Sequence, residues 1–456
     1  YNLNQSILRL KFEEIFYLQI RLIKKNLIRK EKIKGYSFKS IGKYFDEFYK
    51  SILDFDLTNA QKRVIKEIRK DLGGGTQMNR LLQGDVGSGK TIVAFLSALI
   101  AIGNGFQVCI MTPTEILSYQ HYNKFNEICK LLNINIKIIS GSSKASIKKE
   151  IINDLKDGKI DLIIGTHALI YDGVQFNNLG LAIIDEQHKF GVAQRSKLWL
   201  KNKFPPHVLI MTATPIPRTL AMSVYGDLDM SIIDELPPGR KYIETFHQTD
   251  RDRLKLIRFI KNQIHKGKQA YIVYPLIKES EKLDFKDLLD GYESFSRDFP
   301  MPEYHISIVH GKMKNDEKEN EMKRFIENKT QILVSTTVIE VGVDVPNATV
   351  MVIESAERFG LSQLHQLRGR VGRGSDKSFC FLLTGHKKTK ESIMRMETMV
   401  STNDGFIIAE KDLEIRGPGN LMGTQQSGEI PFKITNLIKD NELIIKVRLL
   451  VSTILK

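Results

Sequence analysis

The segment Gly84-Asp85-Val86-Gly87-Ser88-Gly89-Lys90-Thr91 constrains the fold of this chain more than any other feature. It fits the pattern G-x-x-x-x-G-K-[ST] and lies between an apolar run and a helical stretch. In that context the glycines let backbone N–H groups surround phosphates, and the helix N-terminus adds a favourable dipole. A Gly-rich turn that matches by chance is the alternative. The pattern predicts a phosphate-binding loop between a strand and a helix.

Two residues of this loop predict how it treats a nucleotide. Lys90 is expected to neutralise the β- and γ-phosphates, and the Thr91 hydroxyl is expected to ligate Mg²⁺. The residues whose backbone is expected to surround the phosphates are Gly84, Gly87, Ser88 and Gly89. We therefore predict ATP and Mg²⁺ as cofactors.

Short apolar runs alternate with helical stretches from about residue 52 onward, which predicts an α/β fold of parallel sheets with helices on both faces. The first series of runs is Arg80–Gln83, Gln107–Thr112, Ile136–Ser140, Asp161–Thr166, Leu181–Glu186 and Val208–Thr212. The second series is Ala270–Pro275, Ile306–His310, Gln331–Ser335, Thr349–Ile353 and Ser378–Leu383. Two series predict two α/β domains, with the turn Pro237-Pro238-Gly239 as the linker between them.

The two ends of the chain differ from its centre. Residues 1–34 carry apolar side chains near helical spacing, which predicts a helix that packs on a neighbouring domain. Residues from about 386 onward start helical, cross a Gly-rich stretch that begins at Arg416, and end in another helical run. We predict four parts: a helical linker over 1–50, α/β domains over 51–236 and 237–386, and a C-terminal appendage over 387–456.

A pair of carboxylates follows the apolar run that ends at Ile184. Asp185 is expected to hold the metal ion, and Glu186 to orient or deprotonate the attacking water. Acidic pairs at strand ends are common, so this pair alone is a weak signal. Together with Lys90 it predicts nucleotide hydrolysis, which needs both halves of the site.

Three arginines lie within six positions, at Arg368, Arg370 and Arg373. A planar guanidinium donates several hydrogen bonds at once and stabilises charge that develops on a transferring phosphoryl group. We expect Arg370 and Arg373 to reach the nucleotide across a cleft, which would make hydrolysis depend on domain closure. The alternative is a plain nucleic-acid-binding patch.

The chain is basic, with 68 Lys and Arg against 53 Asp and Glu and a formal charge of +15. Such an excess fits a polyanionic partner, with a basic protein that has no such partner as the alternative.

Cys109, Cys129 and Cys380 form no C-x-x-C pair, which favours buried thiols in a reducing compartment over a metal site or disulfides. No run reaches the roughly 18 apolar residues of a membrane span. No secretory signal is visible, so we expect a cytoplasmic protein without membrane contact.

These motifs together resemble those of superfamily 2 helicases, which have a P-loop NTPase core of two RecA-like parallel-sheet domains. Leu57-Thr58 with Gln61 resembles the adenine-reading motif. The strand-contact motifs are matched by Thr112-Pro113-Thr114-Glu115 and Gly165-Thr166-His167. The coupling motif and the next motif of the second domain are matched by Thr212-Ala213-Thr214-Pro215 and Val341-Gly342-Val343-Asp344.

The finer resemblance is to the RecG branch-migration helicases and covers nearly the whole chain. It rests on Asp185–Val192, Thr214–Leu220, Tyr225–Asp229, Pro275–Ile277, and Asp404–Ala409 through to Gly423–Gly428. The last of these resembles the TRG motif, which RecG shares with the transcription-repair coupling factor. In those families the motif transmits ATP hydrolysis to movement along duplex DNA.

The resemblance implies roles for residues outside the phosphate loop. Gln61, Gly342 and Asp344 would contact the nucleotide. The residues that would contact DNA or couple hydrolysis to movement are Thr112, Thr166, His188, Thr212, Thr214, Arg395, Arg416 and Gln426. For Arg416 and the glycines beside it, a plain folded hairpin is the alternative.

By the same resemblance, the chain is expected to be an ATP-driven motor on double-stranded DNA that acts in recombination and repair. It would reverse replication forks and migrate Holliday junctions, and bind branched or double-stranded DNA without sequence specificity. We expect a nucleoid-associated monomer of bacterial type that contacts a single-stranded-DNA-binding protein. RecG proteins carry an N-terminal wedge domain of the OB type. Residues 1–50 resemble only the helical link that follows it, so no wedge is expected in this chain.

Other functions were weighed against this one. A transcription-repair coupling translocase shares the TRG motif but tends to have Glu where Gln187 stands, so Gln187 favours RecG. An RNA helicase of the DEAD type is disfavoured by Gln187-His188 and by the TRG segment. A non-catalytic DNA-binding remnant is disfavoured, because a decaying enzyme would be expected to lose at least one catalytic residue. All of the expected ones are present: Lys90, Thr91, Asp185, Glu186, Arg370 and Arg373.

Overall fold

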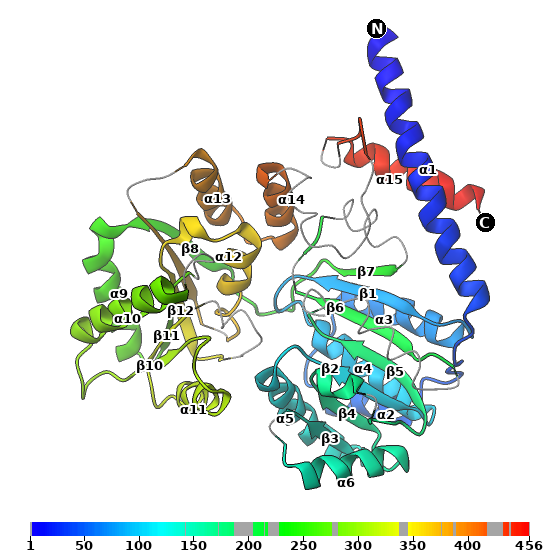
Figure 1. The fold of residues 1–456 in the computed structure, drawn as a ribbon, viewed down its shortest axis with the longest axis horizontal. Helices are drawn as coiled ribbons and strands as arrows, with labels where there is room; N and C mark the ends of the chain where they lie inside the picture. Colours follow the sequence, from blue (N-terminus) through cyan, green and yellow to red (C-terminus); the bar gives the residue numbers. More distant parts are fainter. Residues whose placement is uncertain are drawn as a thin grey trace. The chain divides into compact units, whose positions relative to one another are not determined.

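The computed structural model describes residues 2–141, 143–171, 173–186, 204–213, 215–217, 228–275, 281–336, 345–374, 376–385, 389–416, 432–436 and 439–455. The chain divides into two compact units (Figure 1). Unit 1 comprises Tyr1–Pro237 with Leu413–Lys456, and unit 2 comprises Pro238–Asp412. The first boundary lies in the Pro237-Pro238-Gly239 turn, where the prolines lack the N–H that regular structure needs.

Unit 1 is built on a sheet of seven parallel strands in its described residues, in the order β3-β4-β2-β5-β6-β1-β7. The strands are β1 (Asn79–Gly84), β2 (Gln107–Met111), β3 (Ile136–Ile139), β4 (Leu162–Gly165), β5 (Leu179–Ile184), β6 (His207–Thr212) and β7 (Asp229–Ile233). Every residue of β1, β2, β5 and β6 is buried. Such burial is typical of parallel strands that are covered on both faces.

Alternate residues of the central strands face two separate apolar layers. Leu181 and Ile183 of β5 join the layer formed with α3, α4 and α5, whereas Ala182 and Ile184 join the layer formed with α6 and η2. The helices before and around the sheet are α2 (Lys43–Glu47), η1 (Phe48–Ile52), α3 (Asn59–Gly73), α4 (Lys90–Gly103), α5 (Glu115–Leu131), α6 (Ala145–Lys156) and η2 (His167–Ile170). The period of two along each strand therefore builds a core on both faces of the sheet.

The first and last helices of the chain pack on each other in unit 1. Figure 1 shows α1 (Asn2–Lys32) crossing α15 (Asn441–Ile454), and Ile15 of α1 is buried against Val447 of α15. The sequence predicts that this helix packs on a neighbouring domain, and α15 is the element that it contacts here. Ile7 and Leu8, two of its apolar residues, are 37% and 54% exposed. The contact with α15 covers only part of the length of α1.

Unit 2 holds a second parallel sheet, of six strands in its described residues, in the order β10-β11-β9-β12-β13-β8. The strands are β8 (Ile243–Thr249), β9 (Gln269–Val273), β10 (Ile306–Val309), β11 (Ile332–Ser335), β12 (Ala348–Ile353) and β13 (Ser378–Thr384). The helices are η4 (Asp250–Asp252), α9 (Arg253–His265), α10 (Glu281–Asp298), α11 (Asn315–Ile326), η6 (Ala356–Arg358), α12 (Leu361–Arg368), α13 (Lys390–Ser401) and α14 (Gly405–Arg416). The predicted α/β class with two parallel-sheet domains is confirmed.

Every apolar run of the two predicted series overlaps a strand, but β7 and β8 fall outside both series. Both are edge strands, and neither is continuously buried: two of the five residues of β7 are buried, and one of the seven of β8. An edge strand with one covered face needs no continuous apolar run.

All three cysteines are buried, and burial raises the pKa of the Cys129 and Cys380 thiols to about 12. Thiols with so high a pKa are unreactive at neutral pH. Among the helices that the structure describes, none is both long and apolar enough to cross a bilayer.

Candidate active site

The predicted phosphate loop joins β1 to α4 through two glycines with left-handed backbones. Gly87 has a φ of 76° and Gly89 a φ of 86°, which residues with a side chain rarely adopt. A Cβ at Gly89 would also lie only 2.2 Å from Nε2 of Gln61. Glycine is therefore needed at this position for both conformation and space, as in a loop whose backbone must closely approach a phosphate.

Lys90 is the first residue of α4, and its side chain lies inside the loop. Its Nζ donates to the carbonyl oxygens of Gly84 and Asp85, each at 2.8 Å. The Ser88 hydroxyl is buried and has no hydrogen-bond partner among the described residues. Thr91 is half-buried in the first turn of the helix. A buried ammonium, an unused hydroxyl and a helix N-terminus together form a donor set that fits a phosphate.

Gln61 connects α3 to this loop. Its Oε1 accepts from the Thr58 N–H at 2.9 Å, and Thr58 Oγ1 accepts from the Gln61 N–H at 3.2 Å, which closes a capping box at the start of α3. The Gln61 Nε2 donates to the Ser88 carbonyl at 2.8 Å. The predicted adenine-contacting residue thus lies beside the loop, and its amide is held at both ends.

Asp185 directly follows β5 and is fixed by three contacts. Its N–H donates to the Met111 carbonyl of β2 at 2.8 Å. Its Oδ1 accepts the Glu186 N–H at 3.0 Å, and its Oδ2 lies 3.0 Å from Nε2 of His121 on α5. Because only 9% of Asp185 is exposed, these contacts set the direction of the carboxylate.

Glu186 has an unusual backbone for a residue with a side chain. Its φ is 54°, in the left-handed region. Such conformations persist where the surroundings hold them and cluster at functional sites. The turn at Glu186 ends β5 at the edge of the sheet where the phosphate loop begins.

The carboxyl ends of five neighbouring strands bring predicted site residues to one edge of the unit 1 sheet. From β4 through β2, β5 and β6 to β1, the residues at or just past these ends are Thr166, Thr112, Asp185, Thr212 and Gly84. In open α/β sheets, ligands bind in the crevice outside the carboxyl ends of the strands.

The three predicted threonines at this edge are buried. The Thr112 hydroxyl lies 2.6 Å from Ser118 Oγ and donates to the Thr114 carbonyl at 2.9 Å. Thr114 accepts from the Leu117 N–H at 3.4 Å and caps α5. Thr112 therefore fastens the loop after β2 to the first turns of α5.

Gln83 links the phosphate loop to the predicted coupling segment. It is the residue before Gly84, is fully buried, and donates from Nε2 to the Ile216 carbonyl at 2.6 Å. Ile216 lies four residues after Thr212, at the end of the neighbouring strand β6. This hydrogen bond joins the strand that leads into the phosphate loop to the segment that follows β6.

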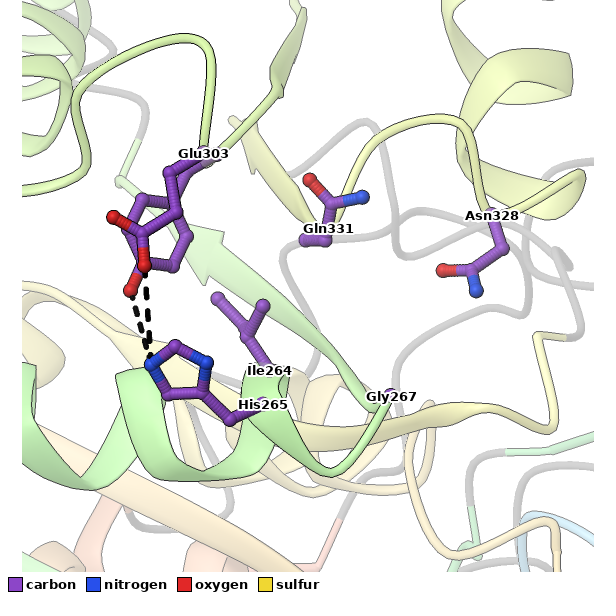
Figure 2. A pocket seen from close by; sticks show the side chains of 7 residues that line it. Ile264, His265, Gly267, Glu303, Asn328 and Gln331 are labelled. Carbon is purple, nitrogen blue, oxygen red and sulfur yellow. Dashed lines mark hydrogen bonds and ion pairs between the residues drawn. The ribbon is translucent and has the colours of Figure 1, made fainter.

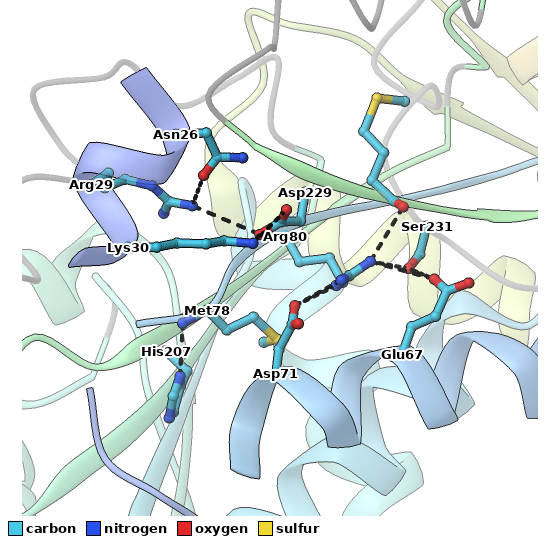
Figure 3. A network of polar contacts seen from close by, with 11 residues as sticks. Asn26, Arg29, Lys30, Glu67, Asp71, Met78, Arg80, His207, Asp229 and Ser231 are labelled. Carbon is cyan, nitrogen blue, oxygen red and sulfur yellow. Dashed lines mark hydrogen bonds and ion pairs between the residues drawn. The ribbon is translucent and has the colours of Figure 1, made fainter. Parts of the chain in front are cut away.

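A charged network supports β1 on the side of the edge strand (Figure 3). Arg80 of β1 donates to Asp71 of α3 at 2.7 Å and to the hydroxyl of Ser231 on β7 at 2.8 Å. Glu67 of α3 contacts both Arg80 and Ser231. The network fixes β7 and α3 on the strand that carries the phosphate loop.

The three clustered arginines of unit 2 have different surroundings. Arg368 is 1% exposed and donates to the carbonyls of Met399 and Thr402 at 2.7 and 2.9 Å. Arg370 is also buried, whereas Arg373 is half-buried. Because two of the three guanidinium groups are buried, this segment is not an open nucleic-acid-binding patch.

The remaining predicted residues have varied places in the structure. Arg395 on α13 is half-buried and donates to the Phe359 carbonyl after η6. Arg416 is the last residue of α14. The predicted residues outside the described ranges are His188, Thr214, Gly342, Asp344 and Gln426, and the Arg416 side chain also lies outside them.

Two residues near the site were missed by the sequence reasoning. His121 touches Asp185 from 64 positions away, and Gln83 reaches the coupling segment from the strand before the loop. The sequence signals were faint, since a single histidine in a helix and a glutamine in an apolar run have many roles.

The predicted donor set for Mg²⁺ is the Thr91 hydroxyl and the Asp185 carboxylate. The described residues contain no group of three or more His, Cys, Asp or Glu side chains that could hold a metal ion. Mg²⁺ commonly uses one or two carboxylates together with substrate phosphates, so this sparse set fits a metal that arrives with a nucleotide.

Unit 2 also has a pocket of about 340 Å³ at the amino ends of β9, β10 and β11 (Figure 2). His265, Glu303 and Tyr304 line it, and the Tyr304 hydroxyl lies 3.3 Å from His265 Nε2. The His265 and Glu303 side chains are each 60% exposed. The pocket is at the edge of the sheet opposite to the carboxyl ends of its strands.

Three families match consecutive parts of the chain. Residues 58–223 match the DEAD/DEAH box helicases, and residues 253–375 match the helicase conserved C-terminal domain. Residues 402–456 match the C-terminal part of domain 3 of the ATP-dependent DNA helicase RecG.

The chain is similar to the ATP-dependent DNA helicase RecG of Synechocystis sp., with 48% identity over 96% of this chain and 52% of that relative. Similarity to RecG of Bacillus subtilis is 47% identity over 95% of this chain and 63% of that relative. The chain thus spans between half and two thirds of the length of these relatives.

Among solved structures, RecG bound to a three-way DNA junction is similar, with a TM-score of 0.78, 44% identity, and 97% and 57% of the two chains covered. The DNA-bound helicase MrfA, at 16% identity and a TM-score of 0.59, shares the fold. With its helicase domains, its RecG-specific C-terminal segment and these relatives, the chain belongs to the RecG family of ATP-dependent DNA helicases.

Proposed function

We propose that this chain hydrolyses ATP and uses the energy to move along double-stranded DNA, including branched DNA. The observation that carries the proposal is that the phosphate loop, Asp185-Glu186 and the strand-contact threonines all follow the carboxyl ends of neighbouring strands in one sheet. With the nucleotide and DNA sites on the same edge of one sheet, a structural change on hydrolysis would reach the DNA contacts over a short distance. The alternatives of a transcription-repair coupling translocase and a non-catalytic remnant are less consistent with the RecG relatives.

In the nucleotide site, Lys90 would leave the carbonyls of Gly84 and Asp85 and meet the β- and γ-phosphates. Thr91 and Asp185 would hold Mg²⁺, which supplies charge neutralisation when bound. Glu186 would orient the attacking water and accept its proton at the carboxylate. Gln61, fixed between α3 and the loop, would read the adenine.

In unit 2, we propose that Arg370 and Arg373 stabilise charge on the transferring phosphoryl group, with Gly342 and Asp344 nearby. Because these residues belong to a different unit from Lys90, hydrolysis would depend on closure of the two units. The proposed division is a linker over 1–50, domains over 51–236 and 237–386, and a C-terminal appendage over 387–456.

For DNA, we propose phosphate contacts and coupling roles for the predicted set Thr112, Thr166, His188, Thr212, Thr214, Arg395, Arg416 and Gln426. Contacts of this kind carry no base information, so binding would be independent of sequence. The formal charge of +15 and the likeness to RecG bound to a three-way DNA junction support branched DNA as the partner. We further propose a cytoplasmic, nucleoid-associated monomer that contacts a single-stranded-DNA-binding protein.

The test is ATP hydrolysis by this chain with linear duplex, single-stranded and forked DNA, beside a Lys90→Ala variant. Duplex DNA should raise the rate at least tenfold in the wild-type chain. Lys90→Ala should lower kcat by a factor of roughly 100 or more, because it removes the cation that faces developing phosphate charge. Far-ultraviolet circular dichroism of both chains controls for folding.

Either of two results would contradict the proposal. Hydrolysis that no DNA stimulates would contradict the proposed motor, because ATP use would then not be coupled to DNA. Stimulation by single-stranded DNA alone would exclude duplex DNA as the track.

A further inference from the structure

We infer that His121 is a positioning residue that aims the Asp185 carboxylate and links it to the DNA-contacting loop through α5. This inference rests on the proposed function, because it assigns a role within the same nucleotide site. It names a residue of α5 that none of the sequence motifs singles out.

The geometry leaves the Asp185 carboxylate little freedom. Its Oδ1 accepts the Glu186 N–H, and its Oδ2 lies 3.0 Å from His121 Nε2. An ionised carboxylate has no proton to give, so Nε2 carries the hydrogen and donates it. Because Asp185 and His121 are 9% and 6% exposed, water competes little for this hydrogen bond.

An aromatic stack fixes the imidazole ring. The ring centroids of His121 and Phe125 are 5.8 Å apart, and the two ring planes are nearly parallel, at 4°. Phe125 stacks in turn on Phe95 of α4 at 4.4 Å. Since α4 begins at Lys90, the donor to Asp185 is held by the same helix that carries the phosphate-loop lysine.

The same helix, α5, starts at the predicted strand-contact loop. Thr114 caps α5, and Thr112 contacts Ser118 at 2.6 Å. Ser118 and His121 are three positions apart, so they occupy one side of the helix. Thr112 therefore contacts Ser118, His121 contacts Asp185, and one side of α5 joins the two pairs. DNA that shifts the start of α5 would shift the metal-holding carboxylate as well.

The experiment compares His121→Leu, which removes the donor, with His121→Gln, which keeps a nitrogen donor on a side chain of similar reach. The affinity for a fluorescent ADP is measured with and without Mg²⁺, and the Mg²⁺ dependence of ATP hydrolysis is measured beside it. Loss of a group that orients a metal ligand commonly costs 10–100-fold. His121→Leu should therefore lose about tenfold or more of the Mg²⁺-dependent gain in ADP affinity, and its Mg²⁺-free affinity should stay within about twofold. His121→Gln should recover most of the gain.

Phe125→Leu is the control, because it disturbs the stack and leaves the donor in place. It should lose less of the Mg²⁺-dependent gain than His121→Leu does. If His121→Leu fails to fold, His121→Asn takes its place, since its shorter amide falls short of Asp185. Mg²⁺-dependent ADP binding equal to wild type in the donor-less variant would overturn this inference alone. No Mg²⁺-dependent nucleotide binding by the wild-type chain would overturn the proposed function and this inference with it.

Discussion

At the residue scale, His207 shows how a buried titratable group in unit 1 serves the backbone. Its Nδ1 accepts the Met78 N–H at 2.9 Å, and its Nε2 donates to the Tyr36 carbonyl at 2.8 Å. Figure 3 shows the first of these contacts beside the Arg80 network. Only the neutral imidazole can accept one of these hydrogen bonds and donate the other, because both nitrogens of the charged ring are donors. Burial lowers the pKa of His207 to about 4.

We expect acid to destabilise unit 1 through this residue. The ordinary histidine pKa of 6.5 falls to about 4 in the folded chain. Between these values the unfolded chain binds a proton that the folded chain does not, so stability is present above pH 6.5 and is lost toward pH 4. The loss corresponds to about 3 kcal/mol. Urea unfolding at pH 7 and pH 4 would measure it.

The matched variant is His207→Gln, which offers an acceptor and a donor but does not titrate. The wild-type chain should lose about 3 kcal/mol more than this variant between the two pH values. Equal losses in the two chains would show that His207 does not titrate as its burial implies.

At the element scale, α1 holds the segment before α15 through one carboxylate. Glu14 accepts the N–H groups of Lys433 at 2.7 Å and Thr435 at 2.9 Å, and also the Thr435 hydroxyl at 2.8 Å. The Ile434 N–H donates to the same carboxylate at 3.2 Å. Partial burial raises the pKa of Glu14, but hydrogen bonds from Lys433, Thr435 and Ile434 outweigh it and the net pKa is lowered. The carboxylate thus joins α1 to residues 433–435 through hydrogen bonds.

Glu14→Gln should weaken the attachment of residues 433–435 to α1, because the amide nitrogen cannot accept a hydrogen bond from a backbone N–H. Loss of one hydrogen bond to a charged group costs about 1.5 kcal/mol. Amide hydrogen exchange at residues 433–435 should therefore become roughly tenfold faster. Glu13→Gln is the control, since Glu13 pairs with the exposed Arg9 and not with this segment. Unchanged exchange in Glu14→Gln would mean that the hydrophobic contact between α1 and α15 holds the segment alone.

Some of these elements could be predicted from sequence, and others could not. The phosphate loop and the buried strands were predictable because their patterns are local: Gly87 and Gly89 need positive φ, and parallel strands need continuous apolar runs. The edge strands β7 and β8 were not, because most residues of each strand are not buried and so form no continuous apolar run. The contacts of His121 and Glu14 are with partners 64 and about 420 positions away, which no local sequence pattern can predict. Likewise, the sequence could not distinguish the buried Arg368 from the half-buried Arg373.

At the scale of the whole molecule, the proposed motor divides its chemistry between two units. Unit 1 holds Lys90, Asp185 and Glu186, and unit 2 holds Arg370 and Arg373. In such an arrangement each cycle of binding and hydrolysis would open and close the units, and DNA contacts would convert that motion into movement.

The most direct test of this account is the displacement of a third strand from duplex DNA. A linear duplex would carry a triplex-forming oligonucleotide ahead of a free track, and release of the labelled oligonucleotide would be followed after adding ATP. The account predicts ATP-dependent release by the wild-type chain and none by Lys90→Ala or with a non-hydrolysable ATP analogue. DNA-stimulated hydrolysis without any release would contradict it, because the chain would then spend ATP on duplex DNA without moving along it.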